Sequence, residues 1–179
     1  MAEELAIIQR VLNGDAESFR LLVERYAGPV IRMIRNTTGD SHTCEDLAQE
    51  VFLSAYVNLA AFDPARSHFA TWLLTIARNK AVNAAKKKRP VCLADPPESA
   101  DPAGPDEAAV RNEFLVALDE QLLALPVEQR TAFVLAEFER LSYQQIAQIE
   151  GVRVGTVKSR INRAKDKLMN ALKRFGDVP

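Results

Sequence analysis

The side chains of this chain with the clearest chemical potential are cations and amides gathered near its C-terminus. Between Arg153 and Arg174 there are eight Lys and Arg residues and a single acid, Asp166. Apolar residues such as Val157 and Ile161 recur there every three or four positions, which predicts a helix with the polar residues on another face. Such a face suits phosphate oxygens and base edges, and it consists of Lys158, Ser159, Arg160, Asn162, Arg163, Lys165 and Lys167. We therefore predict that this helix binds DNA, with a merely solvated helix face as the alternative.

Patterns for catalysis or metal binding are missing from the sequence. The histidines are His42 and His68, and the cysteines are Cys44 and Cys92. His42 and Cys44 are neighbours, but a zinc site requires about four ligands at recognisable spacings. No phosphate-binding loop, glycine fingerprint or nucleophile elbow occurs either. We therefore expect no enzymatic activity, no metal and no other cofactor.

The composition limits the class of protein further. The chain has 179 residues, a net charge of −1 and 47% hydrophobic residues. Indiscriminate coating of nucleic acid is therefore not expected, and any binding must come from local patches. The two cysteines lack a pairing motif, the N-terminus does not resemble a signal peptide, and no apolar run is long enough to span a membrane. We expect a soluble, cytoplasmic protein with no membrane insertion.

A second helix and a tight turn precede the cationic helix. Ser142 and Gln145 have the spacing of a capping box, which starts a helix, and Gly151 suits its end. Val152 and Val154 are expected to pack the turn onto the core. The region from Leu141 to Leu168 therefore has the pattern of a helix-turn-helix, whose second helix enters the major groove. Helix pairs with a glycine turn also occur in all-α proteins that bind no DNA.

A second polar group lies in the middle of the chain. Phe62–Phe69 (FDPARSHF) is predicted as a loop, and Ala70–Lys87 (ATWLLTIARNKAVNAAKK) as a long helix that becomes amide-rich and then basic. Cations at a helix C-terminus suit the helix dipole, which is the structural explanation. Cations beside aromatic rings also suit single-stranded DNA, and the residues alone do not separate the two explanations.

The N-terminal third is predicted to be helical and to carry an acidic face. A helix over Glu3–Asn13 is followed by one from Ala16 to about Tyr26, and Gly28–Pro29 is expected to break the chain before a third helix. In the next helix Asp46, Gln49 and Glu50 lie together on one face. Locally, ordinary acids near a helix N-terminus explain them best.

The composition changes abruptly after Arg89. Residues 90–106 contain five prolines and four acids but no Lys or Arg. Such a segment cannot build a core and is typical of an extended acidic linker. We therefore predict an all-α fold in which an N-terminal helical domain (1–89) is joined by a linker (90–106) to a C-terminal helix-turn-helix domain (107–179).

Two segments, taken together, resemble the extracytoplasmic-function class of the bacterial sigma-70 family. They are DLAQEVFLSAYVNLAAFDPARSHFATWLLTIARNKAVNAAKKKR and LPVEQRTAFVLAEFERLSYQQIAQIEGVRVGTVKSRINRAKDKL. Their order and lengths match the family over nearly the whole chain. The resemblance implies a factor that binds core RNA polymerase and carries it to a promoter for transcription initiation.

The resemblance also implies roles for particular residues and partners. Asp46, Gln49 and Glu50 match the segment that docks on the β′ clamp helices, and the β subunit is a further expected partner. Promoter DNA would be melted and read at the minus-ten element by Arg66, Ser67, His68, Trp72, Arg78, Asn79 and Asn83. The minus-thirty-five element would be read by Lys158, Ser159, Arg160, Asn162 and Arg163, while Lys165 and Lys167 hold phosphates. An anti-sigma factor is the expected regulator.

Two other functions remain compatible with the residues alone. One is a two-domain helix-turn-helix regulator that binds DNA without joining polymerase. It leaves the acidic face at Asp46 and the long amide-rich helix unexplained. The other is an adaptor that binds only proteins, with a solvated basic helix.

Overall fold

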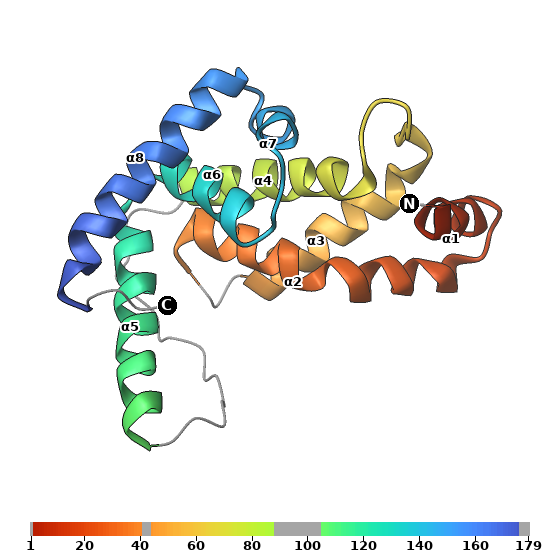
Figure 1. Ribbon diagram of the computed structural model, residues 1–179. Helices are drawn as coiled ribbons and strands as arrows, with labels where there is room; N and C mark the ends of the chain where they lie inside the picture. The colour runs from red at the N-terminus through yellow and green to blue at the C-terminus, as the bar shows by residue number, and fades with distance from the viewer. Residues whose placement is uncertain (1, 41–43, 88–104, 176–179) are drawn as a thin grey trace.

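The computed structural model describes residues 2–40, 44–87 and 105–175, and all regular elements within them are helical (Figure 1). This confirms the predicted all-α class. Short 3-10 turns occur at Ala16–Ser18, Leu59–Ala61 and Lys173–Phe175. The α-helices are α1 (Ala2–Leu12), α2 (Phe19–Thr38), α3 (Cys44–Val57), α4 (Phe69–Lys87), α5 (Pro105–Ala124), α6 (Val127–Glu137), α7 (Tyr143–Glu150) and α8 (Val154–Leu172).

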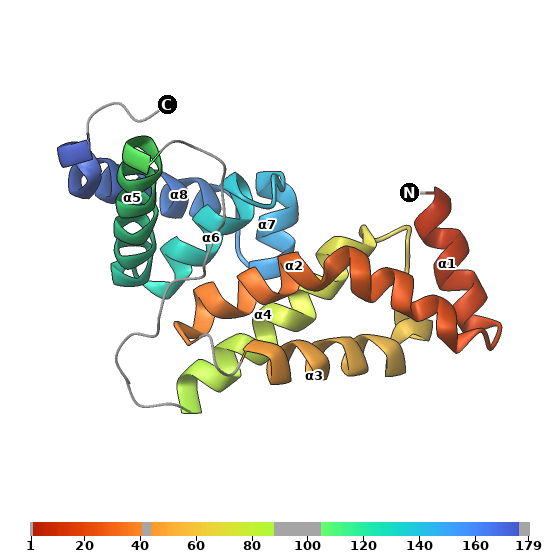
Figure 2. The same ribbon diagram turned by 90° about the horizontal axis from the view of Figure 1, so that it is seen from below.

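The N-terminal half is built on three helices that pack on one another, α2, α3 and α4, with α1 against one end of α2 (Figure 2). Each places its apolar stripe inward because the apolar residues recur every three or four positions. The side chains that are almost fully buried between these helices include Leu22, Met33, Val51, Leu73 and Ala77. The loop between α3 and α4 is thereby held at one end of a rigid helix.

The predicted break at Gly28–Pro29 was wrong. Pro29 lies inside α2, which continues without interruption to Thr38 (Figure 1). Proline inside a helix removes one backbone hydrogen bond and costs about 3 kcal/mol. Val30, Met33 and Ile34 follow it and are almost fully buried. Burial of these side chains offsets the cost, at about 1.5–3 kcal/mol for each.

The C-terminal half consists of α5 to α8, and its local signals were predicted correctly. Ser142 and Gln145 form the expected capping box, and Gly151 ends α7 with φ of 66°. Val152 packs against the core as predicted, but Val154 is 43% exposed because α8 already begins there and turns its side chain outward. The helix-turn-helix is therefore present, with its second helix starting two residues earlier than Thr156.

The two halves pack against each other through α2 with α6 and α4 with α7. One apolar cluster runs through both halves, from Leu22 and Leu73 to Leu135, Ile146 and Ile161. The predicted linker lies mostly outside the described residues, although its last two residues, Pro105 and Asp106, already belong to α5. The division into domains at 89 and 107 stays a prediction.

A buried ion pair joins the two helices of the helix-turn-helix. The Glu150 side chain is 2% exposed, and its Oε2 accepts a hydrogen bond from Nη1 of Arg160 at 2.5 Å. Burial raises the pKa of Glu150, while the hydrogen bond and the charge of Arg160 oppose that rise. The desolvation of the carboxylate is therefore only partly compensated.

The stability of the fold should depend on pH through Glu150. The pKa of Glu150 is raised in the folded state, so protonated Glu150 stabilises the fold below the ordinary glutamate pKa of 4.5. This stabilisation is lost as the pH rises through the pKa that Glu150 has in the folded protein. A Glu150→Gln variant should lose less stability than the wild type between pH 4.5 and 7, as measured by denaturant unfolding. Parallel pH profiles for the two proteins would contradict this account.

Candidate nucleic-acid interface

The loop between α3 and α4 is shaped by a turn at Asp63. The carbonyl of Asp63 accepts the amide N–H groups of Arg66 (3.1 Å) and Ser67 (3.4 Å), and its Oδ1 accepts that of Ala65 at 2.9 Å. At the far end the carbonyl of His68 accepts the N–H of Trp72 at 3.1 Å. Side-chain acceptance of this kind stabilises turns. The loop therefore presents Arg66 and Ser67 in a defined conformation.

An aromatic cluster fixes the loop to the helices. Phe69 is buried, and its ring lies 5.5 Å from Phe62 and Tyr26 and 5.6 Å from Trp72, between ring centroids. Phe62 and Trp72 are also 5.5 Å apart. Tilted and edge-on ring pairs at such distances are favourable. Trp72 is only partly buried, so one part of its ring remains available at the surface.

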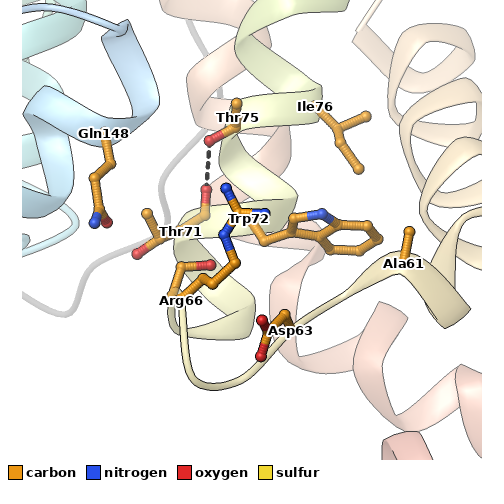
Figure 3. Close-up of a pocket in the computed structure, with 9 residues that line it drawn as sticks. Ala61, Asp63, Arg66, Thr71, Trp72, Thr75, Ile76 and Gln148 are labelled. Carbon is orange, nitrogen blue, oxygen red and sulfur yellow. Dashed lines mark hydrogen bonds between the residues drawn. The ribbon is translucent and has the colours of Figure 1, made fainter.

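A pocket of about 350 Å³ opens beside this cluster (Figure 3). Three of the predicted minus-ten residues line it, Arg66, Ser67 and Trp72. The wall is completed by residues that the sequence analysis did not single out, Ala61, Asp63, Thr71, Thr75, Ile76 and Gln148. Thr75 lies three residues after Trp72 on α4, so helical spacing could have indicated it. Gln148 comes from α7 in the other half (Figure 3), and no local signal predicts it.

The remaining minus-ten candidates lie outside the lining of this pocket. His68 is exposed in the loop, and Asn79 and Asn83 are exposed along α4. The spacing of Trp72, Asn79 and Asn83 places them on one side of the helix, so a polar track continues from the pocket along α4. Arg78 is partly buried, and its Nη1 donates to Oδ1 of Asn79 at 3.2 Å.

The polar face of α8 is less uniform than the sequence suggested. Lys158, Ser159, Asn162 and Arg163 are exposed as predicted. The Ser159 hydroxyl donates to the carbonyl of Thr156 at 2.9 Å but can still accept a hydrogen bond. Arg160 points instead to Glu150, as described above, and its side chain is 22% exposed.

The two predicted phosphate-binding lysines differ from each other. Lys165 pairs with Glu137 of α6, with Nζ and Oε1 2.8 Å apart, which raises the pKa of Lys165. Lys167 is exposed. The available cationic surface of α8 is thus centred on Lys158, Arg163 and Lys167.

The predicted polymerase-docking residues, the acids Asp46 and Glu50 and the amide Gln49, are exposed on α3. Glu50 Oε2 lies 3.1 Å from Nζ of Lys80 on α4, an exposed pair. The same side of α3 continues with Leu53 and Val57, which are 64% and 70% exposed. An acidic face that continues into two exposed aliphatic side chains is suited to protein contact. The sequence did not predict the exposure of Leu53 and Val57.

These three surfaces provide cations, amides and aromatic rings but no catalytic constellation. Within the described parts of the chain there is no group of three or more His, Cys, Asp or Glu that could hold a metal ion. Among those same residues, none of the helices combines the length and apolar character needed to cross a membrane. The chemistry available is hydrogen bonding, stacking and charge pairing.

Residues 22–91 match Sigma-70 region 2, and residues 115–168 match Sigma-70 region 4. The chain is 34% identical over 178 residues to the ECF RNA polymerase sigma factor SigW of Bacillus subtilis, covering 93% of this chain and 95% of the relative. It is 36% identical over 182 residues to the RNA polymerase sigma-H factor of Pseudomonas aeruginosa, covering 95% and 94%.

Solved structures are similar over most of the chain. CnrH, in complex with the cytosolic domain of CnrY, has a TM-score of 0.71 at 25% identity, covering 94% of this chain and 96% of that one. The sigma factor RpoE from Bartonella quintana, in complex with the anti-sigma factor NepR, has a TM-score of 0.74 at 24% identity, covering 90% and 99%. The second similarity supports the fold alone.

The two matched regions cover the two candidate DNA-binding surfaces in the same order along the chain, and the relatives align over nearly their full length. This chain therefore belongs to the sigma-70 family as an extracytoplasmic-function sigma factor, a transcription initiation factor that directs RNA polymerase to promoters.

Proposed function

We propose that the pocket between the 62–68 loop and α4 captures a base of the melted minus-ten strand. The observation that carries this proposal is that Arg66, Ser67 and Trp72 meet around one pocket of about 350 Å³, although they come from a loop and a helix. A base extruded from the stack costs a few kcal/mol, which stacking and hydrogen bonds in a pocket offset. Asn79 and Asn83 continue the path for the strand along α4.

We further propose that α8 reads the minus-thirty-five element in the major groove through Lys158, Ser159, Asn162 and Arg163. Their exposure supports this role, because direct readout requires donors that are free to reach base edges. Arg160 is assigned a different role from the one that the family resemblance implied. Its pairing with buried Glu150 supports a role in holding α8 against α7.

The α3 face is proposed to dock on the β′ clamp helices of core polymerase. Asp46, Gln49 and Glu50 supply charge and hydrogen-bond acceptors, and Leu53 and Val57 supply apolar area. Such a mixture is typical of an interface with an apolar centre and a polar rim. Polymerase carries out RNA synthesis in the bacterial cytoplasm, so the chain itself needs no catalytic group there.

An anti-sigma factor is the regulator that we propose. The similar solved structure of CnrH is a complex with the cytosolic domain of another protein, CnrY, which supports a protein regulator for this chain. The exposed aliphatic pair Leu53 and Val57 is a surface that such an inhibitor could cover in competition with polymerase.

The central test is transcription reconstituted from the full chain, purified bacterial core polymerase and a promoter library. Promoter-specific initiation that depends on both proteins supports the proposed function. Duplex binding without any polymerase-dependent initiation would instead favour a regulator that works alone.

Charge reversal on α3 should abolish polymerase binding. In the double variant Asp46→Lys, Glu50→Lys, the α3 face should repel the polymerase surface that it attracts in the wild type. Co-purification with core polymerase should therefore be lost while the helix content of the variant is unchanged. Leu53→Asp should weaken the same interaction without altering the three polar residues. Glu17→Lys, an exposed reversal on another element, is the matched control. Retained co-purification of the double variant would remove α3 from the interface.

Truncation on α8 should weaken duplex binding at the minus-thirty-five element. Lys158→Ala and Arg163→Ala should each cost about 1–3 kcal/mol where the contact is to a base edge. Binding is measured by fluorescence anisotropy with a minus-thirty-five duplex taken from the promoter library. Lys173→Ala, also exposed but outside the predicted face, should change affinity much less. Equal losses of affinity in all three variants would show that these side chains contribute to DNA binding only through unspecific charge.

A further inference from the structure

Helix α1 lies outside the segments that carry the three proposed surfaces. The match to Sigma-70 region 2 begins at residue 22, so it assigns no role to α1 either. The helix packs against one end of α2 and also contacts the 3-10 turn at Leu59–Ala61 (Figure 2). Ala61 lines the minus-ten pocket. Helix α1 therefore supports the chain at the point where it enters the pocket wall.

A buried carboxylate ties α1 to α2. Glu4 is 8% exposed, and its Oε1 accepts a hydrogen bond from the hydroxyl of Tyr26. Next to it, Oε2 of Glu3 lies 2.9 Å from Nη2 of Arg25, in an exposed ion pair. Burial of a carboxylate is unfavourable unless it is hydrogen-bonded, and an apolar side chain would pack α1 at lower cost. The carboxylate of Glu4 is therefore better explained by the hydroxyl that it holds than by packing alone.

The hydroxyl of Tyr26 is a constant donor in this tie. Burial raises the pKa of Tyr26, and the hydrogen bond to Glu4 and the charge of Glu4 raise it further. The phenol therefore stays protonated near neutral pH. A hydrogen bond from a neutral donor to a carboxylate is among the stronger ones in proteins. The ring of Tyr26 is thus held in one place relative to α1.

Aromatic contacts connect this tie to the pocket. The ring centroid of Tyr26 lies 5.5 Å from that of Phe69, which lies 5.6 Å from that of Trp72. Phe69 is buried, and close packing around it limits its movement. Trp72 lines the pocket. A continuous path of side-chain contacts therefore runs from Glu4 on α1 to the pocket wall.

We propose that Tyr26, held by Glu4, is a positioning residue of the minus-ten pocket. It fixes Phe69 and thereby sets the orientation of Trp72, against which the captured base stacks. A ring that is ordered before the base arrives binds it more tightly, because the entropy of ordering is not lost again on binding. The proposal rests on the proposed function for its DNA-binding part, whereas the packing of Trp72 is measured without DNA.

The first test is the fluorescence of Trp72 in the full chain. Trp72 is the one tryptophan of the sequence, so its signal reports on the pocket wall alone. Tyr26→Phe keeps the ring but removes the hydroxyl, and quenching of Trp72 by acrylamide should rise at least about 1.5-fold through local opening. Glu4→Leu should have the same effect. Glu4→Gln retains an acceptor oxygen and should stay close to the wild type.

The controls separate positioning from a general loss of stability. Tyr26→Phe and Glu4→Leu remove the same hydrogen bond, so the double variant should be quenched no more than either single variant. Tyr143→Phe makes the same chemical change at an exposed tyrosine of α7 and should leave quenching unchanged. Leu168→Ala lowers stability in a separate apolar cluster. Unchanged quenching in Tyr26→Phe, or an equal rise in Leu168→Ala, overturns the positioning role. Circular dichroism confirms that each variant is folded.

The second test measures promoter opening by the holoenzyme on a promoter from the library. With 2-aminopurine in the minus-ten strand as the reporter, Tyr26→Phe should open the promoter at least about threefold more slowly, because the pocket is less well ordered. Co-purification of the variant with core polymerase should be unchanged. Raised quenching of Trp72 with opening at the wild-type rate overturns the link to base capture. If the proposed function fails instead, the wild-type protein opens no promoter, and the quenching of Trp72 still decides whether Tyr26 positions it.

Discussion

The buried side of α4 is the surface on which the rest of the molecule depends. Leu73, Leu74, Ala77 and Ala81 are almost fully buried there, and α2, α3 and α7 all pack against this helix. Two of these residues are alanines, which allow neighbouring helices to approach closely. The same helix carries Trp72 and the amide track on its other side. The position of the pocket, the orientation of the α3 face and the placement of the helix-turn-helix are therefore all set by how one helix is packed.

Local signals in the sequence were sufficient wherever neighbours in the chain determine the structure. The capping box at Ser142, the stop at Gly151 and the period of α8 depend on short-range hydrogen bonds and spacing, and all were confirmed. The predicted break at Pro29 was wrong because burial of residues far apart in sequence outweighs a local penalty. Gln148 in the pocket and Glu150 beside Arg160 were missed for the same reason, since only tertiary packing brings them there.

Many charged side chains of this molecule form ion pairs with one another, which the composition alone does not reveal. The chain has 23 cationic and 24 acidic residues, and several cations near the DNA-facing surfaces already have partners, including Lys80, Arg160 and Lys165. Each such pair reduces the local positive potential and the number of counterions that binding would release. We therefore expect the proposed DNA-binding surfaces to have less intrinsic affinity for DNA than their number of cations implies.

The buried pair of Glu150 and Arg160 also limits how promoter preference can change. The proposed DNA-reading residues Lys158, Ser159, Asn162 and Arg163 are exposed, so substitutions among them should have little effect on the fold. Arg160 lies among them in sequence, yet its replacement would leave the buried Glu150 without its hydrogen-bonded cation, at a cost of about 3–5 kcal/mol. A helix grafted from a relative in place of α8 would therefore need an arginine at position 160, or Glu150 of α7 would have to be replaced by a neutral residue. Under the proposed role of α8, promoter preference can change through these four positions one at a time, whereas position 160 has to change together with position 150 of α7.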